Sequence, residues 1–134
     1  IYVKLSTENI RAIALFEKIT NAHAKDCIIR ENSVYFLVDE SKMGLAIGKD
    51  GFNIKQLRRI IGKNIKIFAY AANLERFIRN IIPNIKTLEI NNDNIIVSVP
   101  NKDKLTVIGK NGENINIIRD MLKRHFNVAN FKLR

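Results

Sequence analysis

The sequence predicts an α+β protein built from two copies of one small unit, and two observations support this class. A stretch of 15 residues recurs 61 positions later, between segments with strand-like and helical hydrophobic patterns. Each copy also contains two glycines separated by two residues, in "IGKDG" and "IGKNG", directly before an amphipathic helix. We therefore expect two domains, residues 1–72 and residues 73–134.

The repeat aligns residues 47–61 with residues 108–122, and seven of these 15 pairs are identical. Apolar character is also kept at Leu57/Ile118 and Ile61/Leu122. Together with Ile54/Ile115, these positions have the spacing i, i+3, i+7 of one helix face, so each glycine pair opens an amphipathic helix. The identical pairs are Ile47/Ile108, Gly48/Gly109, Lys49/Lys110, Gly51/Gly112, Asn53/Asn114, Ile54/Ile115 and Arg58/Arg119.

The segments around the repeat complete each unit. A helix starts after the capping residues Ser6 and Thr7 and is expected to turn Ile10, Ile13 and Phe16 inward, ending near Asn21. A second helix is expected over residues 73–82. Two strands around a polar turn follow in residues 27–38 and 88–99, and closing strands are expected over residues 64–70 and 127–133. The short junction "AYAAN" has no Gly or Pro, which predicts a rigid tandem.

Charge indicates the kind of partner. The formal net charge is +10. Residues 1–72 carry 12 basic and 7 acidic side chains, and residues 73–134 carry 11 and 6, so each part contributes +5. This favours a polyanionic partner, although charge alone does not distinguish DNA, RNA and lipid headgroups. No apolar stretch approaches the ~20 residues of a membrane span, so we expect a cytoplasmic protein that does not bind membranes.

The spacing of the glycines suggests a cradle for an anion. Glycine permits unusual dihedral angles and a close approach of another backbone. The turn leads into a helix N-terminus, whose unpaired amides and dipole favour negative charge, and Lys49 adds a mobile positive charge. An adjacent apolar groove near Ile47 and Ile54 could then hold unstacked bases. The Walker pattern is excluded, because only three residues separate Gly44 from Gly48 and Asp50 follows the lysine.

No catalytic or metal-binding pattern is visible, so we expect no enzyme activity, no metal and no cofactor. The single cysteine, Cys27, lies in an apolar run and is expected in the core. His23 follows the first helix, where it could cap the C-terminus. The phenylalanines Phe52, Phe68 and Phe126 could stack on bases, but core packing is their default role.

At this point the sequence resembles the type II K-homology (KH) domain, in which I-G-x-x-G opens a helix within an α-β-β-α-α-β unit. This resemblance implies two three-stranded mixed sheets packed by helices and single-stranded RNA clamped at the glycine loops. The close tandem, with "KDCII", "LAIGKDG", "GKNIKIF" and "NIIP" in this order, resembles the archaeal NusA-like termination and antitermination factors. The resemblance extends over essentially the whole chain.

The resemblance assigns site residues in both units. The first clamp would comprise Ile47, Gly48, Lys49, Asp50 and Gly51, and the second Ile108, Gly109, Lys110, Asn111 and Gly112. Ile54 and Ile115 would lie either at the groove or in the core. Arg58 and Arg119 would face either phosphate or solvent. Asp50 is expected to point away from the bound anion.

The leading hypothesis is a monomeric, non-catalytic protein that binds nascent single-stranded RNA during transcription termination or antitermination, with RNA polymerase as a candidate second partner. Two alternatives remain. One is a ribosome-associated or ribosome-assembly KH protein that binds rRNA. The other is a structural adaptor whose loops no longer bind RNA.

Overall fold

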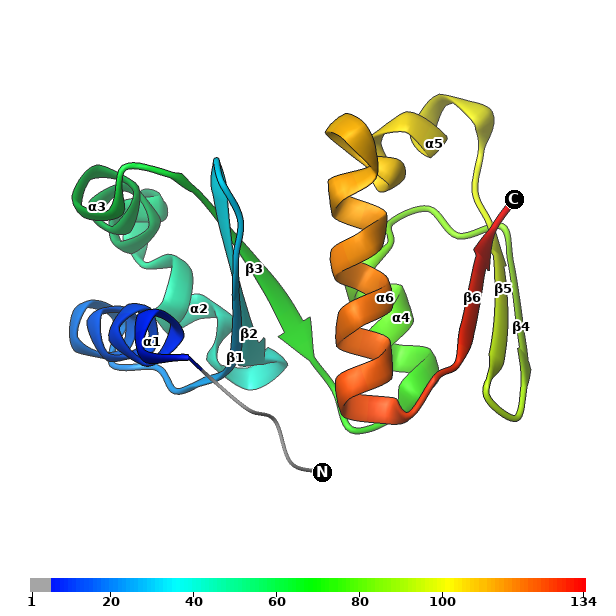
Figure 1. Cartoon of the computed structure of the whole chain (residues 1–134), viewed down its shortest axis with the longest axis horizontal. Helices are drawn as coiled ribbons and strands as arrows, with labels where there is room; N and C mark the ends of the chain where they lie inside the picture. The colour runs from blue at the N-terminus through cyan, green and yellow to red at the C-terminus, as the bar shows by residue number, and fades with distance from the viewer. Residues whose placement is uncertain (1–5) are drawn as a thin grey trace. The chain divides into compact units, whose positions relative to one another are not determined.

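The computed structural model describes residues 6–134, so the first five residues of the expected first domain lie outside the described part. The chain divides into two compact units, with Asn73 at the end of the first and Leu74 at the start of the second. Both units have the same order of α-helices and strands (Figure 1), and the first has an additional 3-10 turn before its second helix.

The first unit carries the elements that the repeat predicts. Its long helix α1 is followed by a hairpin, two short helical segments, a longer helix and a closing strand. The bounds are α1 Thr7–Thr20, β1 Ala24–Ile29, β2 Ser33–Asp39, the 3-10 turn η1 Glu40–Lys42, α2 Met43–Ile47, the 3-10 turn η2 Lys49–Gly51, α3 Phe52–Ile61 and β3 Asn64–Tyr70.

The second unit repeats this order of α-helices and strands from Leu74 onward. Its hairpin has shorter strands than the first, and its last helix is longer. The bounds are α4 Leu74–Ile81, β4 Thr87–Asn91, β5 Asn94–Ser98, α5 Asn101–Ile108, the 3-10 turn η3 Lys110–Gly112, α6 Glu113–Phe126 and β6 Asn130–Leu133.

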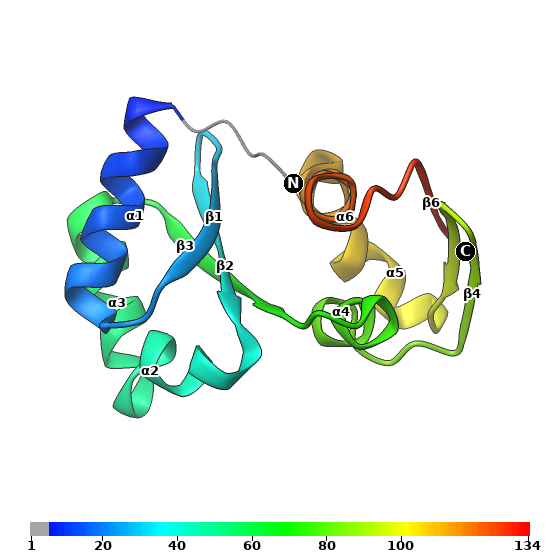
Figure 2. The same ribbon diagram turned by 90° about the horizontal axis from the view of Figure 1, so that it is seen from below.

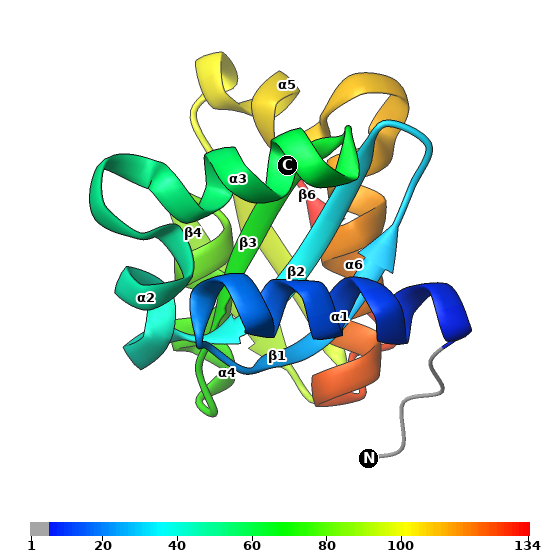
Figure 3. The ribbon, with the colours of Figure 1, turned by 90° about the vertical axis from the view of Figure 1, so that its left-hand side faces the viewer.

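Each unit contains a three-stranded mixed sheet, as expected for the fold class. The strand orders are β1-β2-β3 and β4-β5-β6. In the first sheet β2 pairs antiparallel with β1 and parallel with β3, and in the second sheet β5 has the corresponding two partners. The three helices of each unit lie on one face of its sheet (Figures 1 and 2), and Figure 3 shows α1, α2 and α3 in front of the first sheet.

The helical side of the first sheet forms the core of the first unit. Phe16 of α1 stacks on Phe36 of β2 with ring centroids 4.4 Å apart, and Leu57 of α3 joins the same buried cluster. Cys27 is buried in this cluster as a free thiol, which confirms its expected place in the core. The amphipathic face predicted for α3 is therefore what holds the helix on the sheet.

Helix α1 begins and ends where its sequence indicates. The Oγ of Ser6 accepts a hydrogen bond from the amide of Asn9 at 3.2 Å, and Asn21 ends the helix in a left-handed conformation. The expectation for Ile10 is wrong, since its side chain is 56% exposed. At about 100° per residue, Ile10 lies about 120° around the helix from Phe16, which points into the core.

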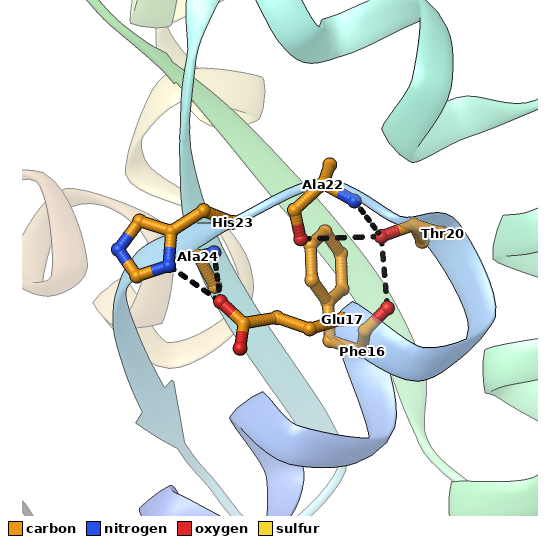
Figure 4. A network of polar contacts seen from close by, with 6 residues as sticks. All are labelled: Phe16, Glu17, Thr20, Ala22, His23 and Ala24. Carbon is orange, nitrogen blue, oxygen red and sulfur yellow. Dashed lines mark hydrogen bonds and ion pairs between the residues drawn. The ribbon is translucent and has the colours of Figure 1, made fainter.

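A polar network fixes the connection from α1 to β1 (Figure 4). The Thr20 Oγ1 donates to the carbonyl of Phe16 at 2.8 Å and accepts from the amide of Ala22 at 3.0 Å. The Glu17 carboxylate accepts from the amide of Ala24 at 3.1 Å and lies 2.5 Å from the Nδ1 of His23. His23 therefore pairs with Glu17, and the capping role suggested for it is wrong because Asn21 fills that position.

The last strand starts later than the sequence pattern suggests. Strand β6 begins at Asn130, whereas the pattern assigns residues 127–129 to it as well. Asn127 is left-handed and ends α6, and the amide of Val128 bonds to the carbonyl of Leu122. Val128, the first apolar residue of the predicted strand, is thus bonded to the end of α6 instead.

None of the helices in residues 6–134 combines the length and the apolar character that a membrane crossing requires.

Candidate nucleic-acid interface

The first glycine loop links α2 to α3 in a tight turn. One position of this turn can be occupied only by glycine. Gly48 has φ 77° and ψ 167°, a region populated almost entirely by glycine. The amide of Gly48 bonds to the carbonyl of Gly44 at 2.9 Å, and the amide of Gly51 bonds to the carbonyl of Gly48 at 3.1 Å. The loop is therefore a short, internally bonded turn with defined geometry.

Asn53 packs beneath Gly48 and holds the turn together. Its Nδ2 donates to the carbonyl of Leu45 at 2.8 Å, so it ties the end of α2 to the start of α3. A Cβ at Gly48 would come within 2.9 Å of the Asn53 side chain. The first glycine is thus required twice, by its dihedral angles and by the close approach of the asparagine.

Gly51 is needed for a different reason. It has φ 73° and ψ 18°, in the left-handed region, and the nearest atom to a Cβ added there would be the Lys55 Cε at 4.0 Å. Asparagine and aspartate reach this region more readily than other residues with a side chain. A side chain at this position would project into open space on the outer side of the loop.

The second loop, between α5 and α6, repeats this geometry. Gly109 has φ 79° and ψ 172°, and Gly112 has φ 75° and ψ 11°. The Nδ2 of Asn114 donates to the carbonyl of Val107 at 2.8 Å, and its Cβ would lie 2.6 Å from a Cβ at Gly109. The two loops are therefore the same structure built twice.

Exposure differs along each loop. Lys49 and Asp50, and likewise Lys110 and Asn111, are exposed, and the glycines beside them are half-buried. The amides of Gly48 and Gly51, and likewise those of Gly109 and Gly112, donate to carbonyls of the preceding helix or of the loop itself. The glycine amides are therefore already paired, and an anion would first meet the two exposed middle residues.

Each loop carries one lysine whose positive charge is not paired with an acidic side chain in the described part of the chain. The ammonium groups of Lys49 and Lys110 form no ion pair with any residue in the described range 6–134. Asp50, which the sequence predicts to point away from an anion, is exposed with φ 55°. The middle of each loop is thus open to solvent and carries one lysine.

The apolar residues of the two predicted sites divide between surface and core. Ile47 is 36% exposed at the end of α2, and its counterpart Ile108 is half-buried. Ile54 packs against the core of the first unit, and Ile115 is buried. Of the two roles considered for Ile54 and Ile115, the structure favours the core.

The two predicted arginines lie in different surroundings. Arg58 is exposed on α3. The Nε of Arg119 donates to the carbonyl of Phe131 on β6 at 3.4 Å. Arg119 thereby lines a cavity of about 640 Å³ between α6 and β6, together with Lys123, Val128, Phe131 and Lys132. Its guanidinium is thus turned toward the edge strand of the sheet.

The three phenylalanines also separate. Phe126 stacks on Phe77 at 5.0 Å, and Phe68 meets Tyr35 edge-on at 5.9 Å, so both have the packing role expected by default. Phe52 does not, because it is the first residue of α3 and 58% exposed. The default assumption is wrong for Phe52, because at about 100° per residue it lies about 140° around the helix from the buried Leu57.

Asn53 and Asn114 hold the two glycine loops in place, but neither is among the site residues predicted from the sequence. The same asparagine occurs two residues after the second glycine in both copies, and it does not belong to the apolar face of the helix. This repetition is the signal that could have identified it.

Among residues 6–134, no three His, Cys, Asp or Glu side chains are grouped as metal ligands.

Comparison with known proteins defines the class of this architecture. The KH domain family model matches residues 10–78, which include the first glycine loop and the elements around it. Because the match covers more than half of the chain, the chain belongs to the KH-domain family. The second unit has the same order of α-helices and strands and the same strand pairing.

Within that family the chain belongs with the archaeal NusA-like proteins. It is 34% identical to the probable transcription termination protein NusA of Methanocaldococcus jannaschii, over 98% of this chain and 75% of that protein. It is 32% identical to the protein of the same name from Thermoplasma acidophilum, over 98% and 96%. A crystal structure of APE1850 superimposes with a TM-score of 0.77 at 36% identity, covering 97% of this chain and 100% of the other.

Proposed function

We propose that the chain binds single-stranded RNA through its two glycine loops and takes part in transcription termination or antitermination. The observation that carries this proposal is the duplicated turn, in which two exposed residues, one of them a lysine, lie beside the N-terminus of a longer helix. Backbone amides at such a position bind phosphate, and KH loops of this pattern clamp about four nucleotides of backbone.

The proposed contact residues follow the loop geometry. The two middle residues of each loop, Lys49 and Asp50 or Lys110 and Asn111, would meet the strand directly, with the Asp50 carboxylate turned away from the phosphate. The glycines Gly48, Gly51, Gly109 and Gly112 would let the backbone approach, and Ile47 and Ile108 would border the bases. Arg58 and Arg119 would supply further positive charge. Ile54 and Ile115 would support the helices from the core side.

Two further properties support RNA as the ligand. The formal charge of +10 favours a polyanion. The relatives are named as probable transcription termination proteins, which makes the nascent transcript the first RNA to test. RNA polymerase is the second partner that this role would require, and we propose a monomer acting in the cytoplasm.

The test places a carboxylate in each loop without disturbing the fold. Gly51 and Gly112 are left-handed, and the nearest atoms to an added Cβ are 4.0 Å away in both. Gly51→Asp with Gly112→Asp should therefore fold normally and lose affinity for a single-stranded oligoribonucleotide by about tenfold or more, because each 1.4 kcal/mol of repulsion is a factor of ten.

The matched control is Gly51→Asn with Gly112→Asn, which has the same shape and no added charge. This control loses whatever affinity depends on the close approach of the strand to the two glycines, so the further loss in the aspartate pair measures the effect of the added charge. If the aspartate pair binds RNA as tightly as the asparagine pair, the loops do not hold phosphate. Co-sedimentation with ribosomal subunits instead of RNA polymerase would favour the alternative of an rRNA-binding protein.

A further inference from the structure

The two loops differ at the residue that follows the second glycine. In the first unit this residue is Phe52, whose side chain is 58% exposed at the start of α3. In the second unit the equivalent residue is Glu113 at the start of α6. Because the backbone angles of the two loops agree closely, the difference lies in the side chains presented beside the same turn.

Charge separates the two loops in the same direction. Residues 48–61 contain the bases Lys49, Lys55, Arg58 and Arg59 and the acid Asp50, which gives +3. The equivalent residues 109–122 contain Lys110 and Arg119 against Glu113 and Asp120, which gives 0. The first loop and its helix therefore attract a polyanion more strongly.

An exposed phenylalanine among basic side chains suits one kind of ligand. Phe52 directly follows the second glycine of the loop that would hold the phosphate, so its ring lies next to the path of the strand. Stacking of an unpaired base on an aromatic ring contributes about 1–3 kcal/mol and needs no particular base. Leu45 and Ile47 are also exposed near this loop and add to the apolar surface. The basic side chains of Lys49, Lys55 and Arg58 are exposed beside it, and this charge favours a polyanion over a protein partner.

We propose that Phe52 stacks on an unpaired base of the bound strand, and that the first unit is the main RNA contact because the second loop lacks such a platform. This inference rests on the proposed RNA-binding function. It assigns different tasks to two loops whose backbones are alike: the first stacks a base on an aromatic ring beside its phosphate contact, whereas the second has no aromatic ring at this position.

A tryptophan at this position reports stacking directly, because the sequence contains no tryptophan. Phe52→Trp should bind single-stranded RNA and show quenched fluorescence when RNA is added, as a stacked base quenches an indole. The matched control is Ile10→Trp on α1, since Ile10 is 56% exposed and Phe52 is 58% exposed. Fluorescence of the control should stay unchanged over the same titration.

Removal of the ring measures its contribution. Phe52→Ala should weaken binding of a single-stranded oligonucleotide about 5- to 150-fold, the equivalent of 1–3 kcal/mol. Phe52→Tyr should restore binding. Ile60→Ala removes an exposed apolar side chain from the same helix and should leave affinity unchanged. On a strand with abasic sites in place of its bases, Phe52→Ala and the unmodified protein should bind equally.

The outcomes distinguish this inference from the proposed function. If Phe52→Ala binds as the unmodified protein does, while the double aspartate variant loses binding, stacking is refuted and the phosphate clamp stands. If Phe52→Trp is quenched by purified RNA polymerase and not by RNA, the ring contacts protein and the inference is likewise refuted. If the unmodified protein binds no single-stranded RNA, the proposed function fails and this inference fails with it.

Discussion

At the scale of single residues, the two glycines of each loop are required for different physical reasons. Gly48 combines a backbone conformation reserved for glycine with an asparagine packed directly beneath it. Gly51 needs only a left-handed conformation and has open space around its Cα. The same substitution should therefore have unequal effects at the two positions.

Gly48→Ala should lower the free energy of unfolding by about 1–3 kcal/mol from the backbone conformation, and the overlap with Asn53 adds to this. Gly44→Ala is the matched control, because Gly44 lies inside α2 with no atom within 4 Å of its Cβ position. That control should be neutral or stabilising by about 0.5–1 kcal/mol. Chemical denaturation measures both, and equal effects would contradict the role given to Gly48.

Asp39 shows how a single hydrogen-bonded carboxylate responds to pH. Its Oδ2 accepts from the hydroxyl of Ser41 at 2.5 Å and from the amide of Ser41 at 3.0 Å, capping η1. These bonds lower the pKa of Asp39 below its ordinary value of 3.8, the hydroxyl contributing most. Because the folded pKa is the lower one, the stabilisation is present above pH 3.8 and is lost as the pH falls through the folded pKa.

A carboxyl titration followed by NMR should therefore place the midpoint of Asp39 below 3.8. Ser41→Ala removes the hydroxyl and keeps the amide, so it should move the midpoint upward toward 3.8 without abolishing the whole shift. A midpoint that is the same in both proteins would show that the Ser41 hydroxyl does not hold the carboxylate.

The loop residues are predictable from the sequence, and the residues that shape the loops are not. The glycines and lysines are visible because they recur at one spacing with a chemical meaning. The part played by Asn53 depends on a hydrogen bond to the Leu45 carbonyl, which forms only after the chain has turned. The exposure of Phe52 could have been inferred from the face that Ile54 and Leu57 define, because Phe52 lies about 140° around the helix from Leu57.

At the scale of elements, the amphipathic helix after each loop fixes the loop to its sheet. Leu57 on α3 is fully buried in the core of the first unit, and three residues further on Ile60 is 56% exposed. The helix is thus held by a narrow apolar stripe, and the basic residues Lys55, Arg58 and Arg59 lie outside it.

Leu57→Ala should lower the free energy of unfolding by about 2–5 kcal/mol, because it leaves a cavity in a packed core. Ile60→Ala is the matched control on the same helix and should change it by less than about 0.5 kcal/mol. Urea denaturation of the two variants tests the orientation of α3. Comparable losses at both positions would mean that the helix is rotated about its axis, with Ile60 turned toward the sheet.

The presence of each helix and strand is predictable from the sequence, whereas the residues at which it begins and ends are less predictable. The closing strand over residues 64–70 coincides with β3, Asn64–Tyr70, because the apolar alternation begins immediately after the glycine that ends α3. The second closing strand starts three residues late, since Asn127 and Val128 are taken into the end of α6. The hydrophobic pattern does not show whether the residues before a strand belong to the end of the preceding helix.

At the scale of the whole molecule, the repeat has two consequences. It gives both units one fold from a modest level of identity, since the identical pairs include the glycines and the asparagine of the loop, and the core face of the helix stays apolar. It also lets the other residues diverge, as Phe52 and Glu113 show. The sequence therefore predicts the common fold well and the separate tasks of the units poorly.

Binding should depend strongly on salt if the loops hold a strand by its phosphates. With about 4–6 phosphates neutralised, the logarithm of the binding constant should fall with the logarithm of salt concentration with a slope of about −3 to −4, from ~0.7 per phosphate on a single strand. Lys49→Gln with Lys110→Gln should reduce the slope by about 1 to 1.5, the share of two phosphates. A flat salt response in fluorescence anisotropy would indicate a ligand other than a polyanion.

The concealed sulfhydryl of Cys27 makes the protein convenient for site-directed labelling. Since this is the single thiol of the sequence and it is fully buried, a maleimide dye should leave the native chain unmodified. A second cysteine introduced at Lys49 or at Lys110 would then carry the dye alone. Crosslinkers attached there would record, for each loop in turn, which nucleotide of a transcript passes over it.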